Sequence, residues 1–415
     1  GVFTNTLPVD AFRGAGGPDP MTMLEAVVDL AADKTGIDRL EIRRRNMVPA
    51  SAMPYTTPVH LVYESGDFEA VMDAAVDRAD WSGFAARRMI SEGKGLLRGI
   101  GLSAYVHCTG GITDEQSTVT VKAEGHVSAL AGGQSSGQGH ETAFAQIVAE
   151  AFDIPYGEVK VVEGDTALIA KGGGTGGSSS TVISGATLAR AAKRAADQGR
   201  EAAAHVLEAA TEDIEIVDGR FTIQGTDRAI GLYDLAAKLA DAENLPPHLS
   251  SRIEAQSEFE DQKATMPQGA IVCEIEIDPA TGFVRIDRVT SAVDVGTEVN
   301  PALVAAQMHG GIAQGLGQAF QEDCRYDQES GQLITGSWMD YSVPKADDFP
   351  FIDHVSVNTP SPNNHMGFKG VGELGTIGAP AAALNAVVDA IGPNSSVSMP
   401  WTAEKIWKAC KGKIQ

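Results

Sequence analysis

Cysteine is scarce in this sequence, and no two cysteines lie close together. The 415 residues include four, Cys108, Cys273, Cys324 and Cys410. Structural zinc sites and iron–sulfur clusters require cysteines at short, regular spacings, so the chain offers neither centre by itself. The length also excludes a small scaffold held together by disulfides. We expect the four thiols to be reduced and mostly structural, in a cytoplasmic protein.

Positive charge is scarce as well. Lysine and arginine total 32 against 55 aspartate and glutamate residues, which gives a formal net charge of -23. Nucleic acids and anionic membranes are bound mainly through clustered positive charge, so neither is an expected partner. The charged fraction of 21% and the hydrophobic fraction of 43% are still those of a folded globular protein. An anionic ligand must therefore be held locally, by backbone amides.

Long apolar runs are lacking too, and we expect no membrane span. The most apolar helical stretch, Ala379 to Ile391, is short and contains Asn385 and Asp389, whereas a membrane span needs about 20 apolar residues. The first residues show no positively charged leader followed by an apolar segment. Since the chain begins at Gly1, we expect a fragment or a processed subunit.

Glycine, in contrast, is abundant and clustered. It accounts for 46 of 415 residues, about 11% against about 7% in ordinary proteins. The clusters occupy residues 14–17, 132–139, 172–177, 310–317 and 370–378. Because glycine permits positive φ angles and close approach of backbone N–H groups, the clusters suggest a large ligand enclosed by main chain. For any single cluster, the alternative is a tight turn between two elements.

Helical and strand patterns alternate between these clusters. Helices are expected at 20–35, 38–46, 68–89, 141–152, 181–210, 301–320, 380–391 and 403–410. In the first helix, Met23, Ala26, Val27 and Leu30 share one face. Strands are expected within 99–130, around Gly219, at 270–277 and 283–293, and at 351–357. The polar stretch 244–266 is expected to be an exposed excursion. The predicted class is α/β or α+β, with mixed sheets and flanking helices.

Five glycine-containing motifs cover the chain nearly end to end. They are DAFRGAGGP from Asp10, GGQSSGQGHET from Gly132, GGGTGGSSST from Gly172, NPALVAAQMHGGIAQGLGQAF from Asn300 and FKGVGELGTIGAPAA from Phe368. In this order they resemble the C-terminal half of the molybdenum-binding large subunit of the xanthine dehydrogenase and aldehyde oxidase family of molybdenum hydroxylases. The resemblance implies that residues 1–95 are the C-terminal part of a first molybdopterin-binding domain and residues 96–415 a second, which carries the catalytic glutamate.

Glu373, in the fifth motif, is the catalytic base that the resemblance implies. In the family, the matching glutamate takes a proton from a molybdenum-bound hydroxyl, so that the oxygen attacks an electron-poor carbon while hydride passes to a sulfido ligand. This role requires a pKa near the operating pH, which we expect burial in a dry pocket to provide. Considered alone, a glutamate in a glycine turn is more often a solvated loop acid.

The resemblance also assigns residues to the cofactor. Gln314 matches a glutamine that hydrogen-bonds an oxo ligand, whereas Gln307 and Gln318 fit a helix surface better. One loop that contacts the pyranopterin and its phosphates would contain Gly137, Gln138 and Gly139. The second would contain Gly176, Gly177, Ser178, Ser179 and Ser180, and a serine N-cap for the following helix is compatible with that role. No side chain is expected to bind the metal directly, because the pterin dithiolene holds the molybdenum.

Arg13 matches an arginine near the cofactor and the substrate pocket. Purine-oxidising members of the family carry phenylalanine at the position of Ala15, where it packs on the flat substrate, so Ala15 argues against xanthine. Carbon monoxide dehydrogenases carry a copper-binding cysteine near this arginine. The chain has no cysteine there, which argues against that reaction.

The resemblance implies a subunit of a hydroxylase that oxidises an aldehyde or a nitrogen heterocycle, with water as the oxygen donor. Its cofactor would be Mo-molybdopterin, in the cytosine dinucleotide form expected of bacteria. The N-terminal half of the molybdenum subunit, a [2Fe–2S] subunit and an FAD subunit are expected as partner chains. A non-catalytic molybdopterin-binding scaffold is the alternative. A nucleotide-dependent dehydrogenase is disfavoured, because no GxGxxG motif links a strand to a helix with an acidic residue about 20 positions later.

Overall fold

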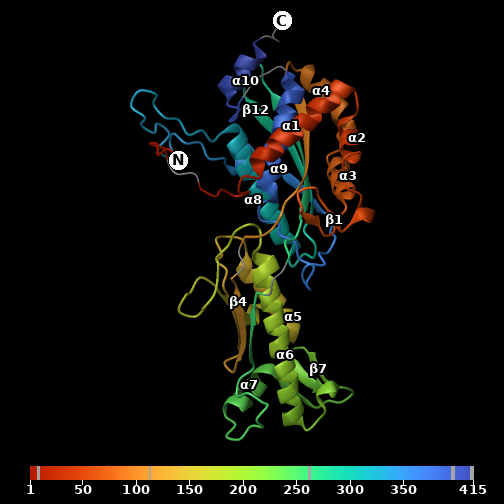
Figure 1. Ribbon diagram of the computed structural model, residues 1–415, viewed down its shortest axis with the longest axis vertical. Coiled ribbons are helices and arrows are strands. Elements are labelled where there is room, and N and C mark those ends of the chain that lie inside the picture. Colours follow the sequence, from red (N-terminus) through yellow and green to blue (C-terminus); the bar gives the residue numbers. More distant parts are fainter. Residues whose placement is uncertain (7–9, 112–113, 260–262, 394–397, 412–415) are drawn as a thin grey trace.

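Two lobes lie end to end along the long axis of the molecule (Figure 1). The structure, a computed structural model, describes residues 1–6, 10–111, 114–259, 263–393 and 398–411. The lower lobe in Figure 1 is formed by residues 114–259, and the upper lobe contains most of the remaining chain. Each lobe is built on a four-stranded sheet that has both antiparallel and parallel neighbours. The predicted class, mixed sheets with flanking helices, is confirmed.

The upper sheet has the strand order β13-β12-β11-β3. Its strands are β3 (Leu97–Val106), β11 (Gln268–Ile277), β12 (Val284–Asp294) and β13 (Ile352–Ser356). β11 is buried along its whole length, as expected for a central strand covered on both faces. Because side chains alternate along a strand, Ile271 and Ile275 enter one core while Ala270 and Val272 enter another.

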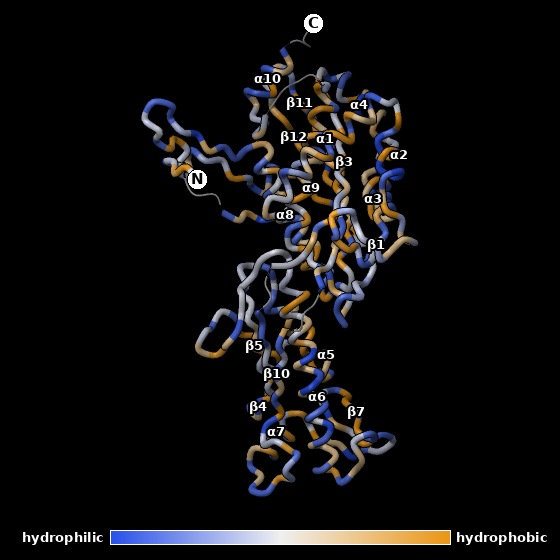
Figure 2. The backbone as a smooth tube through the Cα atoms, viewed as in Figure 1, coloured by the Kyte–Doolittle hydropathy of each residue, from blue (hydrophilic) through white to orange (hydrophobic). Residues whose placement is uncertain are grey.

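Helices cover both faces of the upper sheet. α8 (Pro301–Phe320) and α9 (Leu374–Ile391) pack on one face, and α3 (Phe68–Arg78) and α4 (Phe84–Glu92) pack on the other. Figure 2 shows hydrophobic residues concentrated around β3, β11 and α9, in the interior of this lobe. A short hairpin of β1 (Tyr55–Thr56) and β2 (Val62–Tyr63) precedes α3.

α9 is the central helix of the upper lobe. It is long and apolar enough to cross a membrane by length and composition alone, but 78% of it is buried within the fold, as in a core helix. It starts at Leu374 rather than at the expected Pro380. Gly101 of β3 lets the helix approach the sheet closely, since a Cβ there would lie 2.1 Å from the carbonyl oxygen of Ala382. This packing fixes the N-terminus of α9, where Glu373 stands.

α1 (Pro18–Thr35) turns its apolar face outward. Met23, Val27 and Leu30 are 65%, 60% and 46% exposed, whereas Glu25 and Asp29 are buried. The two carboxylates are compensated by Arg43 of α2 (Arg39–Arg44), whose Nη2 lies 2.6 Å from Glu25 and 2.8 Å from Asp29. The orientation is opposite to that of an ordinary surface helix, which leaves an apolar surface without a partner in the described part of the chain.

The lower lobe has the strand order β10-β4-β5-β6. Its strands are β4 (Gln116–Lys122), β5 (His126–Ala131), β6 (Val159–Val162) and β10 (Glu254–Glu258). The core around Phe144, Phe152 and Phe221 is shared with α5 (His140–Phe152), α6 (Ala186–Leu207) and α7 (Leu232–Ala240). A small sheet of β7 (Ile214–Val217), β8 (Arg220–Ile223) and β9 (Ala229–Gly231) adjoins it. Phe368 of the fifth motif also packs into this core, which ties the two lobes together.

Some elements differ from expectation. The helix predicted at 68–89 is divided into α3 and α4, because Asp80 adopts a φ of 49° between them. The helix predicted at 181–210 begins with a π turn over Thr181–Gly185. The exposed excursion predicted for 244–266 is wrong over 254–258, which form strand β10 paired with β4. Residues 260–262 of that stretch lie outside the described residues.

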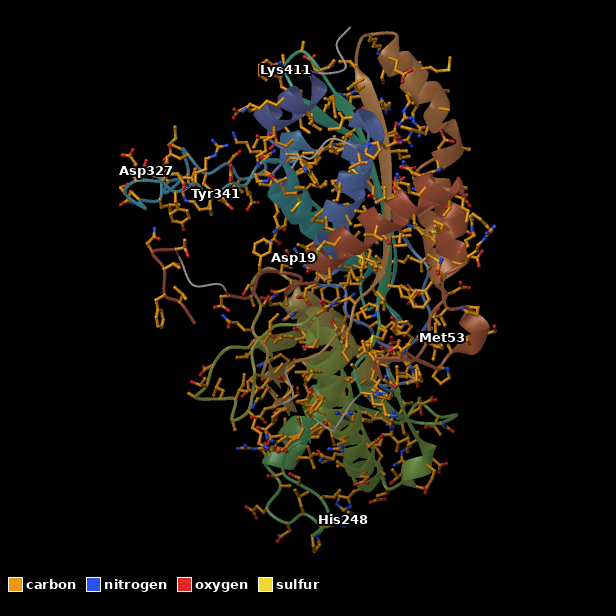
Figure 3. The ribbon with its side chains drawn as sticks, turned by 45° about the horizontal axis from the view of Figure 1, so that its top comes forward. Asp19, Met53, His248, Asp327, Tyr341 and Lys411 are labelled. Carbon is orange, nitrogen blue, oxygen red and sulfur yellow. The ribbon has the colours of Figure 1, made fainter. Side chains whose placement is uncertain are left out.

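An arm between α8 and β13 projects from the upper lobe, where Figure 3 labels Asp327 and Tyr341. Trp338 and Met339 on this arm are 83% and 93% exposed. The final helix, α10 (Ala403–Cys410), agrees with the expectation. The four cysteines, all among the described residues, form no disulfide; two of them are buried and two are exposed.

Candidate active site

A cavity of about 650 Å³ has a lining drawn from both lobes. The lining comes from five separated parts of the chain, residues 11–15, 136–143, 175–181, 295–310 and 369–373. Each part contains or adjoins one of the five glycine motifs. Segments that are hundreds of residues apart in the sequence therefore form one site, as the motif pattern predicts.

Glu373 lies at the wall of this cavity, immediately before α9. Its side chain is 10% exposed. Oε2 accepts a hydrogen bond from Ser178 Oγ at 2.7 Å and lies 3.0 Å from His107 Nε2. Oε1 accepts the backbone N–H of Gly14 at 2.9 Å. The carboxylate thus joins the first, third and fifth motifs at one point.

The expected pKa of Glu373, near the operating pH, is not what the contacts produce. Burial raises the pKa of this carboxyl, but hydrogen bonds from His107 and Ser178, the charge of His107 and the Gly14 N–H lower it, to about 2. The expectation considered burial alone. Several donors directed at a carboxylate favour its ionised form more strongly than partial burial disfavours it.

Arg13 connects the first motif to the fourth and fifth. Its Nε donates to the carbonyl oxygen of Gly372, and its Nη2 donates to the backbone oxygen and Oε1 of Gln307 at 3.1 and 2.9 Å. Burial lowers the pKa of Arg13, while the nearby charge of Glu373 raises it. Ala15, with a φ of 45°, also lines the cavity beside Arg13.

Two glutamines of α8, Gln307 and Gln314, differ in their position relative to the cavity. Gln307, assigned to a helix surface, lines the cavity and accepts from Arg13. Gln314, assigned to the cofactor, is partly buried and is not among the lining residues. The two positions lie on the same side of the helix, two turns apart, and the cavity extends only to Gly310.

Gly137 and Gln138 line the cavity ahead of α5, but Gly139 does not. A Cβ at Gly137 would meet nothing within 4 Å, so the main chain there is open. Gly139, the N-cap residue of α5, has a φ of 78°, and a Cβ there would lie 2.7 Å from Leu303. Gln138 Oε1 accepts the backbone N–H of Ser136, which shapes the loop from within.

The second loop presents Gly176, Gly177, Ser178 and Ser180 to the cavity. Ser179 is buried instead, and its Oγ donates to the carbonyl oxygen of Gly176 at 2.8 Å. The loop is pressed against two other segments, because a Cβ at Gly177 would lie 1.8 Å from Gly110 O and one at Gly370 would lie 1.9 Å from Ser178 O. Small residues are thus required for this loop to reach Glu373.

The lining fits a large, polar, partly anionic ligand. It offers open main chain at Gly137, hydroxyl groups and the guanidinium of Arg13. Its lysine, Lys369, is buried in an ion pair with Asp294 at 2.8 Å. Among the described residues, no group of three or more His, Cys, Asp or Glu side chains could hold a metal ion.

Sequence reasoning missed several residues of the site. One of them, His107, contacts Glu373. Three others line the cavity, namely His140, Gln307 and Lys369. His140 opens α5 and pairs through Nδ1 with Glu163 at 3.0 Å. The positions of Gln307 and His140 inside or beside glycine motifs were an available signal. His107 carried none, since it is 266 positions from Glu373 in the sequence.

Comparisons with known proteins agree with this geometry. A family model described as a molybdopterin cofactor-binding domain matches residues 74–350, and a second model of that description matches residues 1–47. The nicotine 6-hydroxylase large subunit of Paenarthrobacter nicotinovorans is 36% identical, over 100% of this chain and 52% of its own length. The carbon monoxide dehydrogenase large chain of Hydrogenophaga pseudoflava is 32% identical, over 99% of this chain and 53% of its own length.

Solved structures agree as well. Quinoline 2-oxidoreductase from Pseudomonas putida 86 superposes on this chain with a TM-score of 0.90 and is 31% identical to it in sequence. The superposition covers 98% of this chain and 54% of the quinoline 2-oxidoreductase chain. The chain spans about half the length of the curated relatives it matches.

Proposed function

The chain belongs to the molybdopterin cofactor-binding domain family, and we propose that it forms the cofactor-binding half of a molybdenum hydroxylase. The proposed reaction oxidises a C–H bond of an aldehyde or a nitrogen heterocycle, with water as the oxygen donor. Two relatives are named for nicotine and quinoline, which are nitrogen heterocycles, and this favours the second class. The observation that carries the proposal is the ionised Glu373 at the wall of a cavity lined by all five motifs.

The proposed cofactor is Mo-molybdopterin in its cytosine dinucleotide form. When bound, it supplies the metal centre that accepts two electrons from the substrate. The open main chain of Gly137 and the Gly176 to Ser180 loop would bind its polar and phosphate groups. Arg13 would orient this ligand, because its guanidinium is already held by Gly372 and Gln307.

Glu373 is the proposed base. It is ionised over the whole physiological range because its pKa is held at about 2, so it can accept a proton without first losing one. A ligand that displaces one of its hydrogen-bond donors, or that closes the cavity to water, raises this pKa. Burial raises the pKa of the carboxyl, and fewer donors or less water then oppose that effect. The carboxylate therefore becomes a stronger base when the site is filled.

The proposed partners are the N-terminal half of the molybdenum subunit, a [2Fe–2S] subunit and an FAD subunit. Two apolar surfaces support partner contacts, namely the α1 face of Met23, Val27 and Leu30 and the exposed side chains of Trp338 and Met339 on the arm between α8 and β13. The family model over residues 1–47 contains α1, so the remainder of that domain is the proposed cover of the α1 face. The proposal includes a division of the chain into two molybdopterin-binding domains, with the boundary after residue 95.

The test is a comparison of Glu373→Gln with the wild-type chain, each purified with its partner chains. We expect the variant to keep its molybdenum and pterin but to lose turnover, because an amide is isosteric with the carboxylate and cannot accept the proton. Turnover near the wild-type rate would remove Glu373 from the base role. A wild-type complex that carries molybdenum but oxidises neither aldehydes nor heterocycles would favour the scaffold alternative.

A further inference from the structure

His107 occupies a distinctive position beside Glu373. It directly follows β3, and its backbone N–H donates to the carbonyl oxygen of Pro267 at 2.9 Å, which fixes the start of the side chain. Nε2 lies 3.0 Å from Glu373 Oε2, and the imidazole is 14% exposed. His107 is not among the residues lining the cavity. It therefore reaches the carboxylate from a position that is not part of the cavity lining.

The direction of the His107 contact follows from the ionisation of its partner. Because donors keep the pKa of Glu373 at about 2, the carboxylate can only accept hydrogen bonds. Nε2 of His107 must then carry the hydrogen and donate it. Ser178 donates to the same oxygen at 2.7 Å, and its own Oγ accepts the backbone N–H of Glu373 at 3.0 Å.

The two carboxylate oxygens are thus unequally occupied. Oε2 receives two side-chain donors, His107 and Ser178, whereas Oε1 receives one backbone donor, from Gly14. A carboxylate oxygen offers about two lone-pair directions, so Oε2 is saturated and Oε1 keeps one free. Proton uptake at the site therefore falls to Oε1.

We propose that His107 is a positioning residue, which with Ser178 holds Oε2 of Glu373 so that Oε1 is left to accept a proton. This rests on the proposed function of Glu373 as the base. His107 acts through the carboxylate, because it contacts Glu373 but is not among the residues that line the cavity. The packing of α9 fixes the backbone of Glu373, and the imidazole of His107 adds a constraint on its side chain.

Other charged groups near Glu373 come from other elements. Arg13 of the N-terminal segment acts on it electrostatically, and Lys369 of the same motif is neutralised by Asp294. His140 and Glu298 also line the cavity. A change at His107 leaves all four in place, so its effect on Glu373 can be measured separately.

The experiment is a carboxyl ¹³C NMR titration of the glutamate-labelled full chain, without added cofactor, in which Glu373→Gln identifies the Glu373 resonance. His107→Leu removes the donor, and His107→Gln keeps an N–H of similar reach. We expect the titration midpoint of Glu373 to rise by about one pH unit or more in His107→Leu, since a charged hydrogen-bond partner lowers a carboxyl pKa by about 1–3 units. His107→Gln should restore part of the shift. Unchanged midpoints in folded His107→Leu and His107→Gln would overturn the proposal.

Turnover of the loaded complex separates this proposal from the proposed function. His107→Leu should lower kcat more than it raises KM and should move the acidic limb of the kcat profile to higher pH, with recovery in His107→Gln.

If Glu373→Gln is inactive while His107→Leu leaves both the titration midpoint of Glu373 and kcat unchanged, the positioning role of His107 fails and the base role of Glu373 stands. If Glu373→Gln is fully active, the base role fails whatever the titration shows. Should His107→Leu not fold, Ser178→Ala and His107→Gln test the same oxygen.

Discussion

At the scale of single residues, the site depends on donors that converge on one carboxylate. Glu373 and Ser178 could be proposed from their motifs, because glycine and serine patterns mark loops that approach a ligand. His107 could not, since nothing in the sequence around it signals a contact with a residue 266 positions away. The error about the Glu373 pKa has the same origin, because burial can be anticipated from a sequence and distant donors cannot.

The low pKa of Glu373 makes a contribution to stability that depends on pH. Its folded value, about 2, lies below the unfolded value of 4.5, so the contribution is present above about pH 4.5 and is lost as pH falls through 2. Glu373→Gln should therefore be less stable than wild type at pH 7, and the difference should shrink below pH 4.5. Urea denaturation across this range measures it. The exposed Glu124→Gln is the control, and an equal deficit at pH 7 and pH 2.5 for Glu373→Gln would contradict the account.

Gly370 is required because its neighbour is main chain. A Cβ at this position would lie 1.9 Å from Ser178 O, and backbone cannot move aside as a flexible side chain can. Gly370→Ala should destabilise the chain by about 1–3 kcal/mol and displace Ser178 from Glu373. Gly157→Ala is the matched control, since its Cβ would meet nothing within 4 Å. Thermal unfolding compares the two, and equal midpoints would show that the loop packing is looser than described.

At the scale of elements, the strongly periodic segments were predictable. α8 and α10 occupy the expected residues, because their apolar spacing and an Asn300 cap mark them locally. The start of α9 was missed because glycines and a threonine are poor helix formers, and burial against α8 overrides that preference. β10 was missed because its sequence is polar, although Ala255 and Ser257 alternate inward.

Because α1 exposes its apolar face and buries its carboxylates, we expect a charged substitution on the apolar face to lower the free energy of unfolding less than the loss of a buried carboxylate. Val27→Lys should change the free energy of unfolding of the isolated chain by about 0.5 kcal/mol or less, as for an exposed site. Glu25→Ala should cost about 3 kcal/mol, because it deprives the buried Arg43 of one of its two partners. An ordinary amphipathic helix would show the reverse order.

Chemical denaturation of the two α1 variants decides between these orientations. In the complete complex, Val27→Lys should in addition weaken association with the chain that covers α1, which co-purification measures. A large loss of stability in the isolated Val27→Lys chain would mean that Val27 belongs to the core.

At the scale of the whole molecule, the cavity depends on how the two lobes meet. Neither lobe contains the site alone, since the lower lobe supplies the two loops and the upper lobe supplies Arg13, Gln307 and Glu373. The motifs predicted that these segments converge, but they did not reveal that the convergence lies between two separate cores. A ligand that bridges both lobes should stabilise the chain in proportion to its affinity.

The most direct test of the central claim, that this cavity holds molybdopterin, is the molybdenum and released pterin content of the purified complex. Ser180→Trp places an indole in the cavity lining, and Gln134→Trp places one on an exposed neighbouring position outside it. The account predicts equimolar molybdenum and pterin in the wild type and Gln134→Trp, with both lost together in Ser180→Trp. Full retention of both in a folded Ser180→Trp complex would contradict it.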